Sequence, residues 1–232
     1  MSSIKNNLKM VLQRIDDAAA RSGRKPDDVT LIAVSKVHPA SAIVEAFEAG
    51  QRHFGENYAQ ELMDKHTALM TECQDIRWHF IGHLQRNKAK AVVTTGALVE
   101  TVDSVRLAEE LNRQADLRGL SLPILLQVNV GEEPQKSGIP SEALPALMDA
   151  VEGLAHISLE GLMTIPPWDL DREETRKHFA ALRRLREKNG GASRLPHLSM
   201  GMSHDFDVAV EEGATLVRVG TAIFGSRPVR RY

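Results

Sequence analysis

Cysteine is almost absent from this chain of 232 residues, in which Cys73 is the only one. An intramolecular disulfide is therefore excluded, and no set of histidines at metal-binding spacing accompanies the lone thiol. No apolar run approaches the roughly 18 residues that a membrane-spanning helix requires. The polar start, with Ser2, Ser3 and Lys5, lacks the apolar core of a signal peptide. We therefore expect a cytoplasmic protein.

A strong charge imbalance is also missing. The chain has 29 Lys and Arg against 31 Asp and Glu, a formal net charge of -2, with both signs mixed along its length. This balance predicts no binding to nucleic acid or to an anionic membrane. No exposed apolar stripe argues for a stable oligomer, so a monomer is expected. No linker rich in Gly, Ser or Pro divides the chain, and residues 1–232 are expected to form one domain.

What the sequence does contain is an alternation of helical and strand patterns. An opening helix is predicted up to residue 22, because apolar residues recur on one face, namely Ile4, Leu8, Val11, Leu12, Ile15, Ala18 and Ala19. Gly23 follows, at the position where a left-handed glycine ends many helices. Residues 30–35 are an apolar run typical of a strand buried on both faces. Pro39 suits the first turn of a helix that ends at Gly50.

The same alternation continues to the end of the chain. Further candidate strands lie at 52–55, 78–81, 97–102, 124–130, 159–163, 197–200 and 216–219. Candidate helices lie at 59–70, 88–94, 104–117, 141–151, 173–188 and 205–211, the fourth with Pro145 inside it. Strands that alternate with helices predict a parallel sheet covered by helices. Eight strands close a barrel, so we predict an α/β fold, a single (β/α)8 barrel of the TIM type with an extra N-terminal helix.

Lys36 ends the first apolar strand without a polar spacer. Because barrels of this kind place their chemistry at the C-terminal ends of the strands, we expect its amine at the barrel mouth. Burial favours the neutral amine over the ammonium ion, and a neutral amine attacks an aldehyde to form an imine. The alternative is a buried lysine that pairs with a carboxylate.

Two later strand ends offer groups that suit an anion. Ser199, Gly201 and Ser203 lie at the end of the seventh strand, where the glycine lets the backbone approach a ligand. Gly220 and Thr221 end the eighth strand, and N–H groups at the start of a short helical turn there would suit a phosphate. Phosphate sites recur at these two strands of the barrel. Alternatively, the glycines only turn the chain and Ser203 caps a helix.

Strands seven and eight would lie beside strand one, so these features together predict an aldehyde that carries a phosphate. Six motifs occur in order along the chain: Ala33-Val34-Ser35-Lys36, His53-Phe54-Gly55-Glu56-Asn57-Tyr58, Trp78 to Lys88, Glu160-Gly161-Leu162-Met163, Leu198 to Ser203, and Val217 to Gly225. On these motifs the whole chain resembles the pyridoxal phosphate homeostasis proteins of the YggS/PROSC type. That family has a fold similar to the barrel domain of bacterial alanine racemase.

The resemblance implies that pyridoxal 5′-phosphate (PLP), the vitamin B6 cofactor, is held as an imine on Lys36. It further implies that Ser199, Gly220 and Thr221 hold the phosphate and that Arg218 faces the pyridine nitrogen. A guanidinium stays protonated, so at that position it disfavours a protonated ring and weakens the ring as an electron sink. From the residues alone, Arg218 could equally be an arginine that is ion-paired across the barrel.

Four other residues are weaker candidates. Asn57 follows the second strand and could bond the cofactor or simply form a turn, and Tyr58 could reach the mouth or pack in a loop. His79 is better explained as a satisfied core histidine than as a ligand. Lys136, in the loop after strand five, could bind a second phosphate, although a solvated lysine explains it as well.

Three functions fit these residues. The first is a protein that carries or buffers PLP, takes part in PLP homeostasis, has no established catalytic reaction and passes the cofactor to PLP-requiring apoenzymes. The second is a weak PLP-dependent amino-acid racemase. In racemases that resemble this barrel, a tyrosine comes from a second domain, whereas the tyrosines here are Tyr58 and Tyr232. The third is an aldolase that uses Lys36 directly on a phosphorylated sugar.

Overall fold

The strands of this chain close into a barrel. The computed structural model describes residues 3–131, 137–167 and 170–226. In this part of the chain eight parallel strands pair in sequence order, and the last pairs with the first. They are β1 (Thr30–Val34), β2 (His53–Glu56), β3 (Arg77–Phe80), β4 (Leu98–Val102), β5 (Leu122–Gln127), β6 (Ile157–Met163), β7 (His197–Ser199) and β8 (Leu216–Val219). The predicted eight-stranded barrel is confirmed.

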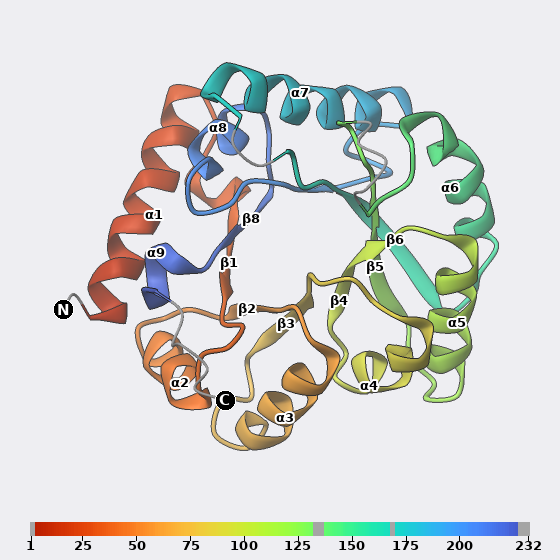
Figure 1. Cartoon of the computed structure of the whole chain (residues 1–232), viewed down its shortest axis with the longest axis horizontal. Helices are drawn as coiled ribbons and strands as arrows, with labels where there is room; N and C mark the ends of the chain where they lie inside the picture. Colours follow the sequence, from red (N-terminus) through yellow and green to blue (C-terminus); the bar gives the residue numbers. More distant parts are fainter. Residues whose placement is uncertain (1–2, 132–136, 168–169, 227–232) are drawn as a thin grey trace.

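Helices surround the barrel on the outside (Figure 1). They are α1 (Ile4–Arg21), α2 (Ala40–Glu48), α3 (Ala59–Leu69), α4 (Ala89–Thr94), α5 (Val105–Asp116), α6 (Leu144–Glu152), α7 (Arg172–Lys188), α8 (Phe206–Glu211) and α9 (Thr221–Phe224). Short 3-10 helices, η1 (Pro26–Asp28), η2 (Arg86–Lys88) and η3 (Ser141–Ala143), precede β1, α4 and α6. In the part of the chain described here, no helix combines the length and apolar character needed to cross a membrane.

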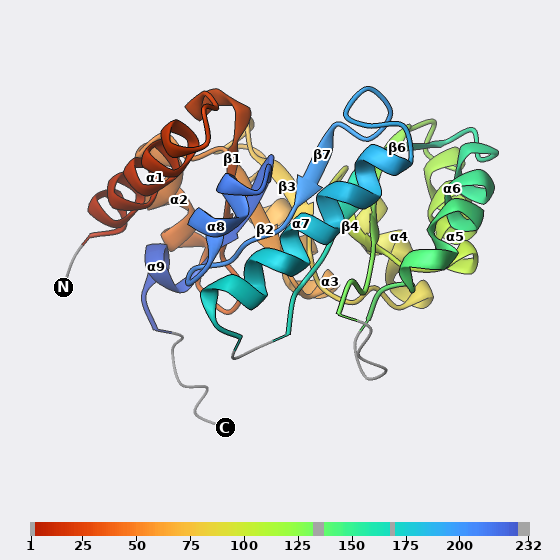
Figure 2. The same ribbon diagram turned by 90° about the horizontal axis from the view of Figure 1, so that it is seen from above.

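The extra N-terminal helix, α1, covers the seam where the barrel closes. It lies beside α8 and α9 in both views (Figures 1 and 2) and contacts both of them. Its apolar face, with Leu8, Val11 and Ile15, is buried. Gly23 has a φ of +69°, and its N–H and that of Arg24 bond back to carbonyls of the last helical turn. The predicted glycine stop is confirmed, and it turns the chain toward β1.

Two of the predicted boundaries differ in an instructive way. The fifth strand, expected at 124–130, runs from Leu122 to Gln127 instead. Pro123 fits because it is the second residue of the strand, near its start, and Val128 leaves the sheet to form a single bridge with Ile139. Helix α6 begins at Leu144, with Pro145 in its first turn, where a missing N–H costs nothing. Pro145 therefore starts this helix and does not bend it.

Apolar side chains pack in two layers. The larger layer lies between the strands and the helices, and a smaller cluster, Ile32, Leu125, Met163 and Leu216, is separate from it. Polar side chains are also fully buried, among them Glu100 on β4 and Ser199 on β7. These two strands are not neighbours in the barrel, so the bond between the two side chains crosses its interior.

Candidate functional site

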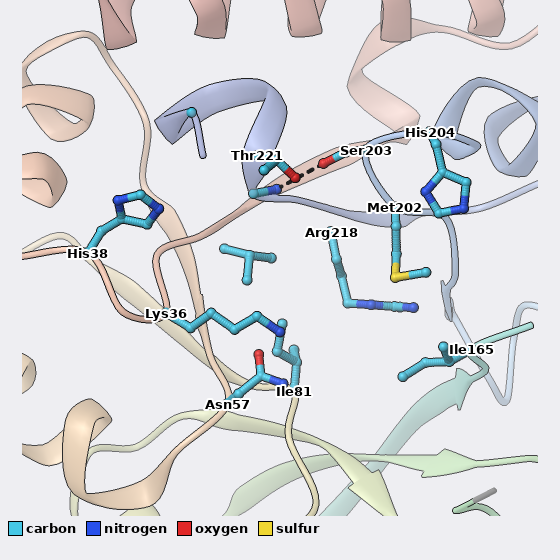
Figure 3. A pocket seen from close by; sticks show the side chains of 13 residues that line it. Lys36, His38, Asn57, Ile81, Ile165, Met202, Ser203, His204, Arg218 and Thr221 are labelled. Atoms are coloured by element: carbon cyan, nitrogen blue, oxygen red, sulfur yellow. Dashed lines mark hydrogen bonds between the residues drawn. The ribbon is translucent and has the colours of Figure 1, made fainter. Parts of the chain in front are cut away.

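A cavity of about 200 Å³ lies at the C-terminal ends of the strands. Residues that follow β1, β2, β3, β6, β7 and β8 line it, together with the ends of β1 and β8. They are Val34, Lys36, His38, Asn57, Ile81, Ile165, Met202, Ser203, His204, Arg218, Gly220, Thr221 and Gly225. Figure 3 shows the amine of Lys36 and the guanidinium of Arg218 extending into the same space. The end of the barrel that the sequence analysis selected thus holds the predicted lysine.

The backbone on the N-terminal side of Lys36 is fixed by a buried lysine of α3. The amine of Lys65 donates to the carbonyl of Ser35 over 2.8 Å and to Glu56 Oε1 over 2.7 Å. The hydroxyl of Ser35 donates to the same Glu56 oxygen over 2.6 Å. Since Ser35 and Glu56 are fully buried and Lys65 is only 7% exposed, these bonds hold the residue before Lys36 from two sides.

The backbone on the other side of Lys36 is strained. Val37 has a φ of +63°, a left-handed conformation that a β-branched residue rarely adopts. Such a residue costs roughly 1–3 kcal/mol and persists only where its surroundings determine it. Here the N–H of Val37 donates to Glu61 Oε1 over 2.6 Å, and Glu61 in turn accepts from Lys65 over 2.7 Å. Lys65, Glu56 and Glu61 therefore form a clamp that positions both peptide neighbours of Lys36.

Two buried oxygen atoms near Lys36 have no hydrogen-bond partner among the described residues, Glu56 Oε2 and Asn57 Oδ1. Burial raises the pKa of the Glu56 carboxyl, while the charge and hydrogen bond of Lys65 act in the opposite direction. Asn57 lines the cavity, where a buried amide oxygen without a partner is costly. Asn57 is thus ready to accept a hydrogen bond from a ligand.

The position of Asn57 depends on a glycine of the next loop. A Cβ atom added to Gly82 would lie 2.0 Å from the carbonyl oxygen of Asn57. The carbonyl of Gly82 accepts from the hydroxyl of Thr101 over 2.6 Å, which fixes this close approach from β4. Gly82 belongs to the motif from Trp78 to Lys88, and it allows the loop after β2 to lie against the loop after β3.

Arg218 is bonded inside the barrel and also lines the cavity, without a direct ion pair to a carboxylate among the contacts of the described residues. Its side chain is 4% exposed, donates to Ser199 Oγ over 2.5 Å and to the carbonyl of Thr164 over 2.9 Å. It also lines the cavity. Burial lowers the pKa of the Arg218 guanidinium, and the charges of Glu100 and Asp205 act against burial. Arg218 is therefore a cation fixed inside the barrel with one face toward the site.

The groups suited to an anion line the cavity where β8 ends. Gly220 is the N-cap of α9, and Thr221 is its first residue. The N–H of Gly220 donates to Ser203 Oγ over 3.3 Å, which brings the loops after β7 and β8 together (Figure 3). The first N–H groups of any helix lack a partner within the helix. Ser203 does not cap α8, since Asp205 stands at that position.

Ser199 and Gly201, two further candidates, do not line the cavity. The hydroxyl of Ser199 donates to Glu100 Oε2 over 2.5 Å inside the barrel. Gly201 has a φ of +92°, and a Cβ atom there would lie 2.6 Å from the Cβ of Ala209 in α8. The need for glycine at 201 thus comes from the packing of α8. Contact of either residue with a bound cofactor stays a prediction.

The remaining candidates, His79, Tyr58 and Lys136, do not line the cavity or lie outside the described residues. His79 is a buried core histidine bonded to Glu100 and His53, as expected. Tyr58 is 55% exposed and precedes α3, outside the cavity around Lys36. Lys136 and Tyr232 lie outside the described residues. Within the described ranges, His, Cys, Asp and Glu side chains form no group of three or more that could hold a metal.

Lys65 and Glu100 were not predicted from the sequence, although each has a recognisable signal there. Lys65 stands between Leu62 and Leu69 on the buried face of α3, where an apolar residue is expected. Glu100 stands in the middle of β4, in a strand that is otherwise apolar except for Thr101. A charged residue on a buried face needs a partner, so both positions indicated a buried partner for the charge.

Comparisons with known proteins show the family of this chain. The family described as "Alanine racemase, N-terminal domain" matches residues 3–228. The "Pyridoxal phosphate homeostasis protein" of Pseudomonas aeruginosa is 45% identical over 228 residues, covering 98% of this chain and 97% of that protein. The structure of PipY from Synechococcus elongatus with PLP bound is 42% identical, has a TM-score of 0.83, and the match covers 96% of this chain and 100% of PipY.

The fold is also that of a racemase domain. An alanine racemase of Bartonella henselae matches with a TM-score of 0.71 at 17% identity, over 99% of this chain and 60% of the racemase. This likeness concerns the barrel alone. With its length almost fully covered by relatives above 40% identity, the chain belongs to the pyridoxal phosphate homeostasis protein family, within the alanine racemase N-terminal domain fold.

Proposed function

We propose that this chain binds PLP as an imine on Lys36 and that residues 1–232 act as one PLP-binding domain. One observation carries the proposal: an amine, a buried amide oxygen without a partner and a hydroxyl-rich helix start converge on one cavity. PLP presents the complementary groups, an aldehyde, a ring hydroxyl and a phosphate. The PLP bound in the PipY structure supports the same reading.

The residues present fit that cofactor. Lys36 would attack the aldehyde, and Asn57 Oδ1 would accept a hydrogen bond from a ring hydroxyl. Ser203, Gly220 and Thr221 would hold the phosphate by hydroxyl and backbone N–H groups. When bound, PLP supplies an electrophilic carbon that an amine can capture reversibly. The chain itself supplies the clamp of Lys65, Glu56 and Glu61, which fixes the backbone around Lys36.

We propose that the protein carries or buffers PLP and does not run an efficient amino-acid reaction. The support is the charge of Arg218, fixed by two hydrogen bonds. A guanidinium beside the ring nitrogen keeps that nitrogen unprotonated, which weakens carbanion chemistry. No tyrosine among the described residues lines the cavity to act as a second proton donor or acceptor. Delivery to apoenzymes, a monomeric state and a cytoplasmic location belong to the same proposal.

Titration of the protein with PLP tests the binding mode. We expect a visible imine band in the native protein that is lost in Lys36→Ala and retained in a matched control, Lys88→Ala, whose side chain is exposed outside the cavity. Equal bands in both variants would refute Lys36 as the attachment point. Loss of α-deuterium from amino acids in ordinary water would favour the racemase instead, and complete retention would favour the carrier.

A further inference from the structure

A chain of hydrogen bonds crosses the inside of the barrel, starting at the candidate site. Arg218 Nη1 donates to Ser199 Oγ, and Ser199 Oγ donates to Glu100 Oε2, each over 2.5 Å. Glu100 Oε1 lies 2.7 Å from His79 Nδ1, and His79 Nε2 lies 2.9 Å from His53 Nδ1. The five side chains come from five different strands, β8, β7, β4, β3 and β2.

The chemistry of these groups fixes the direction of each bond at the cofactor end. A guanidinium only donates and a carboxylate only accepts. The single hydroxyl proton of Ser199 must therefore point to Glu100, while the oxygen accepts from Arg218. For the same reason His79 Nδ1 must carry a proton that it donates to Glu100. Ser199 is thus a bridge with one possible orientation between a buried cation and a buried anion.

Arg218 and Glu100 are the charges joined by this bridge. They are 4% and 0% exposed, and a buried charge without compensation is strongly destabilising. Burial alone would raise the pKa of Glu100, but the hydrogen bond and charge of His79, with Arg218 and Ser199, lower it below its ordinary value. Glu100 is therefore ionised at neutral pH.

The charge of a second carboxylate, Asp205, also acts on Arg218, but this carboxylate is bonded to other groups. Asp205 accepts from the N–H of Met202 over 2.6 Å and lies 3.2 Å from His204 Nε2. Its pKa is raised, chiefly by burial. Among the described residues, Glu100 is thus the carboxylate that reaches Arg218 through a hydrogen-bonded bridge.

We propose that Glu100 is a positioning residue for the cofactor: through Ser199 it holds the Arg218 guanidinium in place and compensates its charge at the cavity that would hold PLP. The inference rests on the proposed function. Two hydrogen bonds, to Ser199 and to the Thr164 carbonyl, fix the plane of the guanidinium. Its other N–H groups remain for the cavity that Arg218 lines. Removal of the Glu100 charge would leave an uncompensated cation in the cavity that Lys36 also lines.

The test is a pH titration of the visible imine band in PLP-loaded Glu100→Gln. An uncompensated positive charge disfavours a protonated imine, so we expect the midpoint of the transition to fall by about one pH unit. The matched control is Glu160→Gln, on β6. The carboxylate of Glu160 accepts from Ser158 and is not bonded to any of the five side chains that connect Arg218 with His53. The midpoint of this variant should equal that of the native protein.

Two further variants separate positioning from a merely structural role. In an Arg218→Leu background the added Glu100→Gln should shift the midpoint less than it does in the native protein, because the cation that Glu100 positions is gone and only the direct effect of its own charge remains. Ser199→Ala keeps both charges and removes only the bridge, so a smaller shift in the same direction is expected even if Glu100→Gln does not fold. An imine on Lys36 with an unshifted midpoint in Ser199→Ala and Glu100→Gln overturns the role of Glu100. A native protein without any imine overturns the proposed function itself.

Discussion

The clamp behind Lys36 makes a quantitative prediction for Lys65→Met. Methionine keeps most of the volume of the side chain and removes the amine, which donates to Ser35, Glu56 and Glu61 over 2.7–2.8 Å. Removal of one partner from a buried ion pair costs about 3–5 kcal/mol, because the other charge stays buried without compensation. Glu56 is 0% exposed, so we expect Lys65→Met to decrease the free energy of unfolding by an amount within this range.

The loss should depend on pH. Burial already raises the pKa of Glu56 above its ordinary value of 4.5, and Lys65 opposes this rise. Without the amine the folded state binds a proton on Glu56 more tightly than the unfolded state does. Stability must then decrease as the pH rises from 4.5 through the folded-state pKa. The cost of Lys65→Met should be largest near pH 8 and smaller near pH 5.

Urea denaturation followed by circular dichroism at both pH values measures this effect. Lys90→Met is the matched control, since Lys90 is exposed on α4, and it should change stability by at most about 0.5 kcal/mol. Addition of Glu56→Gln to Lys65→Met should recover much of the loss, because the fully buried carboxylate is gone and only the partly exposed Glu61 loses its partner. A cost of Lys65→Met below about 1 kcal/mol, or one equal at both pH values, would refute the clamp.

Three shorter predictions follow from other contacts. Val37→Gly should relieve backbone strain and reduce the cost of Glu61→Gln, measured as a double-mutant cycle of unfolding free energies; strict additivity would show that the bond does not hold the strained residue. Gly82→Ala should weaken PLP binding measured by absorbance, since its Cβ would displace the backbone of Asn57; unchanged affinity would count against that contact. Burial lowers the pKa of His53 to about 4, so the unfolded state takes up a proton first and stability should fall between pH 6.5 and 4. His53→Gln should flatten that part of a pH series of thermal unfolding, and a persistent slope would contradict this assignment.

Much of the architecture could be predicted from periodic patterns. The alternation of apolar strands with amphipathic helices determines the barrel, and Lys36 could be selected because it follows the end of a buried strand, after Ser35. The order of strands then brings the loops after β7 and β8 next to β1. Local patterns and the topology of a closed sheet were sufficient for these steps.

Contacts between residues far apart in the chain could not be predicted in the same way. The bond from Ser199 to Glu100 joins residues on non-neighbouring strands, and no local pattern specifies which side chains meet inside a barrel. The same holds for two candidate residues: no local pattern shows that Ser199 bonds to Arg218 and Glu100 inside the barrel, or that Gly201 packs against α8. Their contact with a cofactor stays a prediction. The strain at Val37 is equally invisible in a sequence, because valine is the residue least expected to adopt it.

The central claim is that Lys36 is the residue that holds PLP. Borohydride reduction of the PLP-loaded protein, followed by proteolysis and peptide mass mapping, tests it most directly, because reduction converts the imine into a stable adduct on the lysine that formed it. The account predicts one stoichiometric pyridoxyl adduct, on the peptide that contains Lys36. A native protein in which the adduct lies on another lysine, with Lys36 unmodified, would contradict it.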